Sequence, residues 1–337
     1  MPLIKIWVYD GILASSVAGV ADVFTAANWI AADGRKSRKS PPLLWRIESL
    51  DGRGIRTASG QLIDVDGSIN ARSSADAVIV PGPFVPDIEG FLERKEVVTP
   101  LIAALRRQHQ RGVLLASYCT GSFLLAEAGL LDGSGATTHW ARGRTFEQRY
   151  PDVDLRINDI ITEQDDIICS GAVTSALNLA LRIVEKLVGS EVAAETGKLM
   201  LIDGNRVAQS SYASMQEEPH SDRLVSRAQR WMEKSLQRGY SLGDLARQLA
   251  VSERTLNRRF KQAIGKAPLH YLQGLRIDVA KRLLETKELT LDAVSQRVGY
   301  GDLSTFRRLF KRETGLSPRE YQRRFSRRHR QRAAVAA

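Results

Sequence analysis

Short apolar runs alternate with longer helical patterns over the first part of the chain. The runs that predict buried strands lie at residues 4–9, 44–50, 77–80 and 113–117. Helical patterns follow or separate them at residues 17–32, 97–108, 122–128 and 173–188. Strands separated by helices of this length predict an α/β domain with a doubly wound, largely parallel sheet. Asp165 and Asp166, between two further apolar runs, indicate a hairpin turn.

The pattern changes after residue 224, where only helical periodicity remains, so an all-α domain is expected there. This part contains an internal repeat. Its matches, at a constant separation of 50, are Arg258 with Arg308, Phe260 with Phe310, Lys261 with Lys311, Gly265 with Gly315, Pro268 with Pro318 and Tyr271 with Tyr321. Each copy reads as a capped amphipathic helix, a short turn and a second helix, which is typical of a helix-turn-helix unit. A long helix over residues 269–285 is expected to join the two units.

Charge is distributed unevenly along the 337 residues. Residues 1–220 hold 22 basic and 27 acidic side chains, whereas residues 221–337 hold 27 basic and 11 acidic ones, a net charge of +16. A basic excess confined to one domain indicates a polyanionic partner, most often nucleic acid. The composition, 43% hydrophobic and 26% charged, is that of a soluble globular protein, and no apolar stretch is long enough to span a membrane.

The second helix of each repeat carries the outward polar side chains that could read DNA. Arginine and lysine suit guanine edges and phosphates, asparagine suits adenine, and serine and threonine suit either. A solvated helix face is the alternative interpretation, but two copies at matched spacing within a basic domain favour DNA. The predicted DNA-binding residues are Ser252, Arg254, Thr255, Asn257, Arg258, Lys261, Ser304, Thr305, Arg307, Arg308, Lys311 and Arg312.

The stretch GYGDLSTFRRLFKRETGLSPREY at residues 299–321 resembles the C-terminal signature of AraC/XylS-type transcription regulators. The resemblance covers about residues 222–326. It implies that two helix-turn-helix units read successive major grooves of double-stranded DNA, and that the N-terminal domain tunes activity in response to a small-molecule effector. It favours an activator that contacts RNA polymerase, while repression remains open. The oligomeric state, including a homodimer, is also open.

Three segments of the N-terminal domain resemble the class I glutamine amidotransferase-like, PfpI-type fold, which has a flavodoxin-like sheet. They are VIVPGP at 78–83, SYCTGSFLLAEAGLLDG at 117–133 and ATTHW at 136–140. The whole chain therefore resembles the AraC-type regulators that carry this domain in front. In that fold Cys119 stands on a nucleophile elbow, at a helix N-terminus where the dipole favours a thiolate.

A cysteine nucleophile needs a base or an orienting partner. Thr120 stands where peptidase-like members have histidine, and Ser16 stands where isonitrile hydratases have an acidic residue. His139 and Asp10 remain candidate bases. Cys119 is therefore interpreted as a pocket contact with no catalytic residues assigned, and a cysteine-dependent hydrolase or isonitrile-hydratase-like enzyme fused to a DNA-binding domain is the alternative.

The expected ligand pocket lies at the carboxyl ends of the strands, where open α/β sheets bind ligands. Its predicted lining residues are Gly82, Pro83, Cys119, Thr120, His139 and Trp140. The resemblance implies a small nitrogenous metabolite, and the Trp140 ring would suit a cationic amine, although a purely structural Trp140 is nearly as reasonable. No cofactor or metal is expected, because neither nucleotide-binding glycine motifs nor metal-ligand spacings occur.

The resulting domain prediction has four parts. A sensing domain at 1–205 precedes a polar linker at 206–221, a DNA-binding domain at 222–326 and a basic tail at 327–337. The N-terminus runs directly into a strand pattern without the features of a signal peptide, and only two cysteines occur, so a cytoplasmic protein with reduced thiols is expected.

Overall fold

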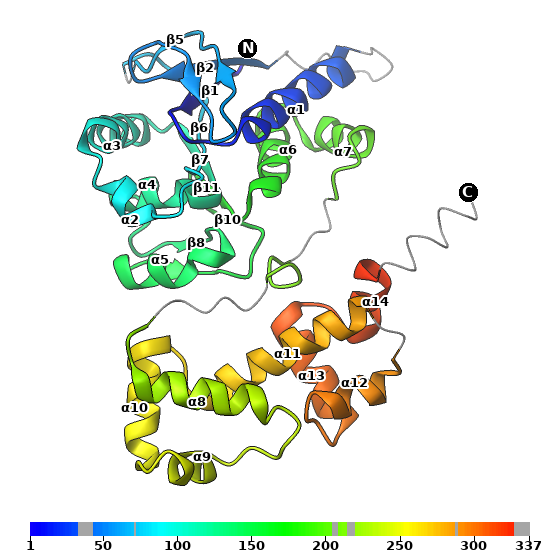
Figure 1. Cartoon of the computed structure of the whole chain (residues 1–337). Coiled ribbons are helices and arrows are strands. Elements are labelled where there is room, and N and C mark those ends of the chain that lie inside the picture. The colour runs from blue at the N-terminus through cyan, green and yellow to red at the C-terminus, as the bar shows by residue number, and fades with distance from the viewer. Residues whose placement is uncertain (33–42, 71, 204–207, 214–219, 287–288, 327–337) are drawn as a thin grey trace. The chain divides into compact units, whose positions relative to one another are not determined.

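The computed structural model describes residues 1–32, 43–70, 72–203, 208–213, 220–286 and 289–326. The chain divides into two compact units between Gln209 and Ser210 (Figure 1). The expected domain end at residue 205, parts of the expected linker and the expected basic tail lie outside the described residues.

A seven-stranded sheet forms the centre of the first unit, in the order β10-β11-β7-β6-β1-β2-β5. The four apolar runs correspond to β1 (Leu3–Val8), β2 (Leu44–Ser49), β6 (Ala77–Val80) and β7 (Leu114–Tyr118). The other strands are β5 (Gly67–Ser68), β10 (Ile161–Gln164) and β11 (Ile167–Ser170). Neighbouring strands are parallel except in the β10–β11 hairpin, whose turn residue Asp165 has a φ of 51°. The predicted doubly wound, largely parallel sheet is confirmed.

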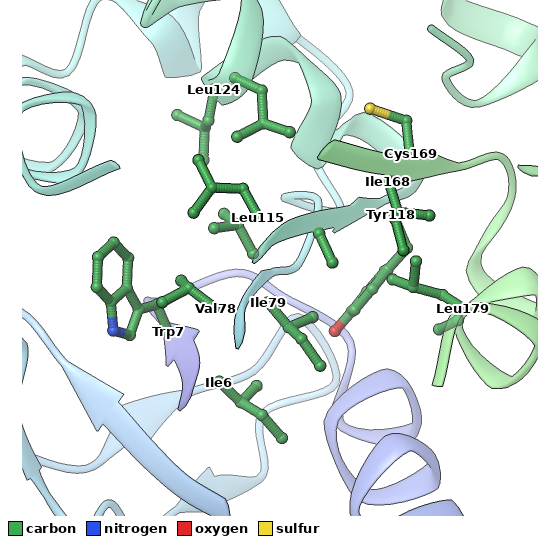
Figure 2. Packing of buried hydrophobic residues seen from close by; sticks show 14 of the residues in the cluster. Ile6, Trp7, Val78, Ile79, Leu115, Tyr118, Leu124, Ile168, Cys169 and Leu179 are labelled. Atoms are coloured by element: carbon green, nitrogen blue, oxygen red, sulfur yellow. The ribbon is translucent and has the colours of Figure 1, made fainter. Parts of the chain in front are cut away.

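Helices cover both faces of the sheet. The helices α1 (Ala14–Ala32), α6 (Ala176–Leu187) and α7 (Ser190–Leu199) pack together on one side, and α3 (Lys95–His109) and α4 (Ser122–Glu127) lie on the other (Figure 1). Figure 2 shows side chains of β1, β6, β7 and β11 packed with Leu124 of α4 and Leu179 of α6. Because both faces of these strands are buried, their sequences read as continuous apolar runs.

Several elements of the first unit were not predicted. They are α2 (Ile88–Leu92), α5 (Gly143–Arg149), α7, the strands β3 (Ile55–Arg56), β4 (Leu62–Ile63), β5, β8 (Gly135–Ala136) and β9 (Asp154–Leu155), and the 3₁₀ turns η1 (Cys119–Gly121) and η2 (Trp140–Arg142). The helix predicted over residues 173–188 begins as a 3₁₀ turn, η3 (Val173–Ser175), and continues as α6. β3 pairs with β4 and β8 pairs with β9 in two small sheets. Most of these elements are too short to show a hydrophobic period.

The second unit contains only helices among its described residues. They are α8 (Arg223–Lys234), α9 (Leu242–Gln248), α10 (Glu253–Ile264), α11 (Pro268–Thr286), α12 (Leu291–Arg297), α13 (Leu303–Thr314) and α14 (Pro318–Phe325). The predicted all-α domain with two helix-turn-helix units is confirmed: α9 and α10 form one, α12 and α13 the other, and α11 joins them (Figure 1). Each helix-turn-helix unit has its own apolar core. The expected N-caps Ser241 and Thr290 accept backbone hydrogen bonds from Asp244 and Ala293.

The turns of the two helix-turn-helix units place left-handed backbone at equivalent positions. Ala250 has a φ of 57°, and Gly299 in the second turn has a φ of 82°. Only glycine fits at position 299, because a Cβ there would lie 2.2 Å from the carbonyl oxygen of Leu236. The second turn therefore approaches the segment that follows α8.

Arg276 holds this close approach in place. It is 7% exposed, its Nε donates to the Leu236 carbonyl at 3.0 Å, and its Nη2 donates to the Arg238 carbonyl at 2.7 Å. Its guanidinium lies 5.2 Å from the centre of the Tyr300 ring. One side chain of α11 thus joins the segment before the first helix-turn-helix to the turn of the second.

The expected linker differs from a free segment in its described part. Gln209 is 2% exposed in the first unit, with its Nε2 within 3.1 Å of oxygens of Thr137, Thr138, Ile157 and Asp159. In the second unit, the buried Lys281 donates to the carbonyls of Ser210 (2.7 Å) and Ala213 (2.6 Å), and Ser211 donates to the Thr314 carbonyl. Residues 209–213 are therefore packed, because polar groups hold a segment that lacks an apolar period.

Candidate ligand site and DNA-binding face

Cys119 occupies a sharp turn between β7 and α4. It directly follows Tyr118, the last residue of β7, and it begins η1 with a φ of 58°. A non-glycine residue in this conformation costs on the order of 1–3 kcal/mol. The strain is characteristic of a nucleophile elbow, in which a strand passes abruptly into a helix.

Two glycines allow the elbow to contact the turn after β6. A Cβ on Gly82 would lie 2.5 Å from the Thr120 backbone nitrogen, and a Cβ on Gly121 would lie 2.5 Å from the Val80 carbonyl oxygen. Thr120 also donates its hydroxyl to the Pro83 carbonyl at 2.9 Å. The structure therefore brings four of the predicted pocket residues together: Gly82, Pro83, Cys119 and Thr120.

The thiol of Cys119 is protonated at neutral pH. The side chain is 6% exposed, and burial raises its pKa to about 11, against weaker opposing effects of hydrogen bonds with Thr120 and of the positive charge on Arg142. Within the described residues, neither Asp10 nor His139 hydrogen-bonds to the Cys119 sulfur. The Asp10 carboxylate instead accepts from the Arg56 backbone at 2.7 Å.

Ser16, at the position expected for an acid, is part of a buried polar cluster. It accepts a hydrogen bond from the Tyr118 hydroxyl at 3.1 Å and donates its own to the Leu13 carbonyl at 2.6 Å. In the same cluster, the Tyr9 hydroxyl donates a hydrogen bond to the Pro81 carbonyl. Burial raises the pKa of both tyrosines well above the usual value. These hydroxyls therefore remain protonated and position the elbow and the adjacent turn.

His139 and Trp140 stand next to the elbow on a separate segment. Thr138, the residue before them, donates its hydroxyl to the Cys119 carbonyl at 3.2 Å. The two half-buried rings stack with centres 5.4 Å apart. His139 Nδ1 accepts a hydrogen bond from the Ala141 backbone at 3.1 Å and so caps η2, and burial lowers its pKa, with the nearby Arg142 acting in the same direction.

Arg142 is a site residue that sequence reasoning missed. Its Nη2 donates to the carbonyls of Val85 (3.4 Å) and Pro86 (2.6 Å), which joins η2 to the loop after β6. Its positive charge acts to lower the pKa of both Cys119 and His139. No motif signalled this residue, because the contact depends on how two loops meet.

The predicted DNA-binding residues lie on α10 and α13 or at their N-termini, as expected for second helices of helix-turn-helix units. Ser252 caps α10 by accepting from the Thr255 backbone. Asp302 caps α13 in the same way, a role that the sequence pattern did not identify. The exposed members of the predicted set are Ser252, Arg254, Arg258, Lys261, Ser304, Arg307, Arg308, Lys311 and Arg312, whereas Thr255, Asn257 and Thr305 are half-buried.

One member of this set is partly committed to the protein itself. Arg312 forms hydrogen bonds with Glu313, at 2.6 Å from Nη2, and with Gln273 of α11, at 3.1 Å. Arg312 thus differs from Arg307, Arg308 and Lys311, and a contact to DNA would have to compete with these two partners.

The comparisons with known proteins agree with both halves of this description. Residues 245–324 match a helix-turn-helix domain family, and residues 45–186 match the DJ-1/PfpI family. The HTH-type transcriptional regulator CdhR of Pseudomonas aeruginosa is 27% identical over 276 residues, which covers 81% of this chain and 80% of that protein. An uncharacterized protein from the cpoL 5′ region of Streptomyces lividans is 34% identical over 148 residues, 44% of this chain and 94% of that protein. The chain belongs to the AraC-type regulators with a DJ-1/PfpI domain.

This AraC-type regulator is a DNA-binding transcription regulator, as its resemblance to that family implied. Its first unit has the fold of an AraC family regulator from Pseudomonas putida whose crystal structure superimposes with a TM-score of 0.50 at 19% identity, over 59% of this chain and all of that one. Among the described residues, no helix is long and apolar enough to cross a membrane, and no group of three or more His, Cys, Asp or Glu side chains is arranged to hold a metal ion.

Proposed function

We propose that the DJ-1/PfpI unit is a non-catalytic sensor that binds a small metabolite at the Cys119 elbow and thereby controls DNA binding. The observation that carries this proposal is the state of the thiol. An elbow that supports nucleophilic chemistry needs a thiolate and a base, and here burial raises the Cys119 pKa to about 11 and no base is hydrogen-bonded to the sulfur within the described residues.

The chemistry around the elbow suggests the class of effector. Trp140 offers an aromatic ring that suits a cationic amine, and Arg142 places a positive charge that suits a carboxylate. A small nitrogenous acid, such as an amino acid or a betaine, would satisfy both. A ligand of this kind changes DNA binding only if its affinity differs between two states of the protein. We propose that it favours the DNA-bound, transcription-activating state.

The test is a thermal-shift screen of amines, amino acids and amides against the full chain. A ligand at 100 times its Kd should stabilise the protein by about 2.7 kcal/mol. Trp140→Leu should remove the shift. Cys169→Ala is the control and should leave the shift in place. This second cysteine is buried on β11, outside the proposed ligand site, and accepts a hydrogen bond from Ser117. The proposal fails if no member of these classes shifts the midpoint.

A cysteine enzyme is the second candidate, and the strained φ of 58° at Cys119 favours it. Each stabilising compound is therefore incubated with the protein and its concentration followed by mass spectrometry. A sensor leaves the compound unchanged. Consumption that Cys119→Ser abolishes and Cys169→Ala does not would establish turnover and refute the sensor.

The DNA-binding residues have a separate test. Arg258→Ala or Arg308→Ala should weaken binding, by about 1–3 kcal/mol and with relaxed preference at one base if the side chain contacts a guanine. A reporter gene with the selected operator then gives the sign of regulation, because an activator raises its transcription when the effector is added and a repressor lowers it.

A further inference from the structure

The second helix-turn-helix unit contains a cavity of about 320 Å³. It lies where α12, α13 and the start of α14 meet. Four cationic side chains line it, together with the apolar Leu291 and Pro318. The four are Arg307, Arg308, Lys311 and Arg319.

These four cations have no hydrogen bond or ion pair within the described residues, and all four are exposed. Among the lining residues that the structure describes, none carries a carboxylate. Two nearby acids have other roles, since Asp302 accepts backbone hydrogen bonds at the start of α13 and Glu320 accepts from the Ser317 backbone at the start of α14. Arg308 and Lys311 interact electrostatically with these two carboxylates, but none of the described lining residues is acidic, so the cluster of four cations favours an anion in the cavity.

The repeat supplies a comparison between the two helix-turn-helix units. At the separation of 50 residues, Arg308 and Lys311 match Arg258 and Lys261, so both units share this pair of cations. The other positions differ: Arg307 corresponds to Asn257, and Arg319 corresponds to Leu269, which is 45% exposed. At the positions that line the cavity, the second unit therefore has two cations that the first lacks.

The substituted positions differ in what they can recognise. The amide of Asn257 suits the paired donor and acceptor of an adenine edge, which carries sequence information. A pocket of arginine and lysine suits phosphate oxygens, which carry none but fix the position of a protein on the duplex. The asymmetry of the repeat thus gives the first unit an amide that suits a base edge and the second unit a group of cations that suits phosphates.

We propose that the cavity seats backbone phosphates of DNA, so that the second helix-turn-helix unit anchors the regulator while the first reads sequence. This inference rests on the DNA-binding function. It assigns Arg319 as a phosphate contact outside the recognition helix, and Asn257 as a specificity-determining residue.

The experiment uses the full chain and a pool of random-sequence 30-bp duplexes. The affinity for the pool is measured over a range of salt concentrations for the wild type, Arg319→Ala, Arg319→Lys and Asn257→Ala. The slope of log K against log salt falls by about 0.9 for each phosphate that the protein no longer neutralises. Arg107→Ala is the charge-matched control, because this exposed arginine lies on α3 of the DJ-1/PfpI unit.

The expected results separate the two roles. Arg319→Ala should lower the slope by about 0.9 and weaken binding several-fold, Arg319→Lys should restore most of the slope, and Arg107→Ala should change neither. Sequences selected from the pool should stay the same for Arg319→Ala, whereas Asn257→Ala should lose the preference for adenine at one position. Circular dichroism melting confirms that each variant is folded.

Three outcomes overturn the proposal. An unchanged slope for folded Arg319→Ala would show that the residue does not contact phosphate, and an altered base preference would make it a reader. If Arg319→Ala leaves the salt slope for DNA unchanged and yet removes a micromolar stabilisation of the chain by pyrophosphate, the cavity holds a free anion and not a DNA phosphate. If the wild type does not bind the duplexes at all, the DNA-binding function itself fails. The wild type thus tests DNA binding, and the variants test the role of the cavity separately.

Discussion

Arg276 offers a direct test of how the two helix-turn-helix units are held together. In Arg276→Met the side chain keeps its approximate length and loses its two hydrogen bonds to the Leu236 and Arg238 carbonyls and its contact with the Tyr300 ring. Hydrogen bonds from a charged donor contribute about 1.5–3 kcal/mol each, and a cation–π contact about 0.5–2 kcal/mol. Methionine also removes the cost of burying a charge, which is evident from the lowered pKa of Arg276.

The two carbonyls are only partly buried, so we take the lower value for each hydrogen bond. The free energy of unfolding of the second unit should then fall by about 3 kcal/mol. For a unit of this size that corresponds to a midpoint about 10 °C lower. Differential scanning calorimetry of the full chain measures it, with the transition of the second unit identified by its stabilisation with DNA. Arg282→Met is the matched control on the same helix, because its ion pair with Asp278 is solvent-exposed on the arginine side and should contribute about 0.5 kcal/mol or less.

Equal shifts for Arg276→Met and Arg282→Met would refute this reasoning. The contact between α11, the segment after α8 and the second turn would then not stabilise the unit.

Three single residues give further predictions. Ala250→Gly should stabilise the second unit by about 0.5–1 kcal/mol and so raise its calorimetric midpoint. The φ of 57° costs alanine roughly 1–2 kcal/mol, and glycine adds a smaller entropy cost. A lower midpoint would contradict this. Cys119 should react with iodoacetamide at pH 7.5 about 100-fold more slowly in the native chain than after unfolding, as followed by mass spectrometry, because its pKa of about 11 leaves little thiolate; equal rates would show that a thiolate is present. The pKa of His139 is lower in the folded than in the unfolded chain, so the unfolded state binds more protons and the free energy of unfolding should fall as the pH drops below about 6.5. His139→Gln should flatten this decline in urea titrations, and identical profiles for His139→Gln and the wild type would exclude the residue.

The fold was predictable wherever apolar side chains dominate. The buried strands β1, β6 and β7 read as continuous apolar runs because helices cover both faces, and the helices of the second unit showed clear periods because each buries one face. Helix caps were readable from Ser241 and Thr290. Two-residue strands such as β8 and β9 leave no such pattern, since they depend on pairing with distant segments.

The site was predictable in part. The segment around Cys119 and the turn at Gly82 could be located because parallel strands end at one edge of the sheet. Arg142 and Tyr9 could not, because their hydrogen bonds go to backbone carbonyls, which every residue has. A sequence pattern identifies side chains with distinctive chemistry, and it does not show which backbone groups they meet.

The packed segment at residues 209–213 explains why a lapse in apolar periodicity is a poor measure of a free linker. A buried amide or ammonium that finds several carbonyl oxygens is satisfied without any apolar neighbour. Gln209 does so in the first unit, where Gly171 leaves it room because a Cβ there would lie 2.1 Å from the Gln209 side chain. Lys281 does so in the second, although burial lowers its pKa and so adds a cost to keeping the charge. These two anchors hold neighbouring residues of the chain, Gln209 in the first unit and Ser210 in the second, so the polar composition of the segment reflects how it is held.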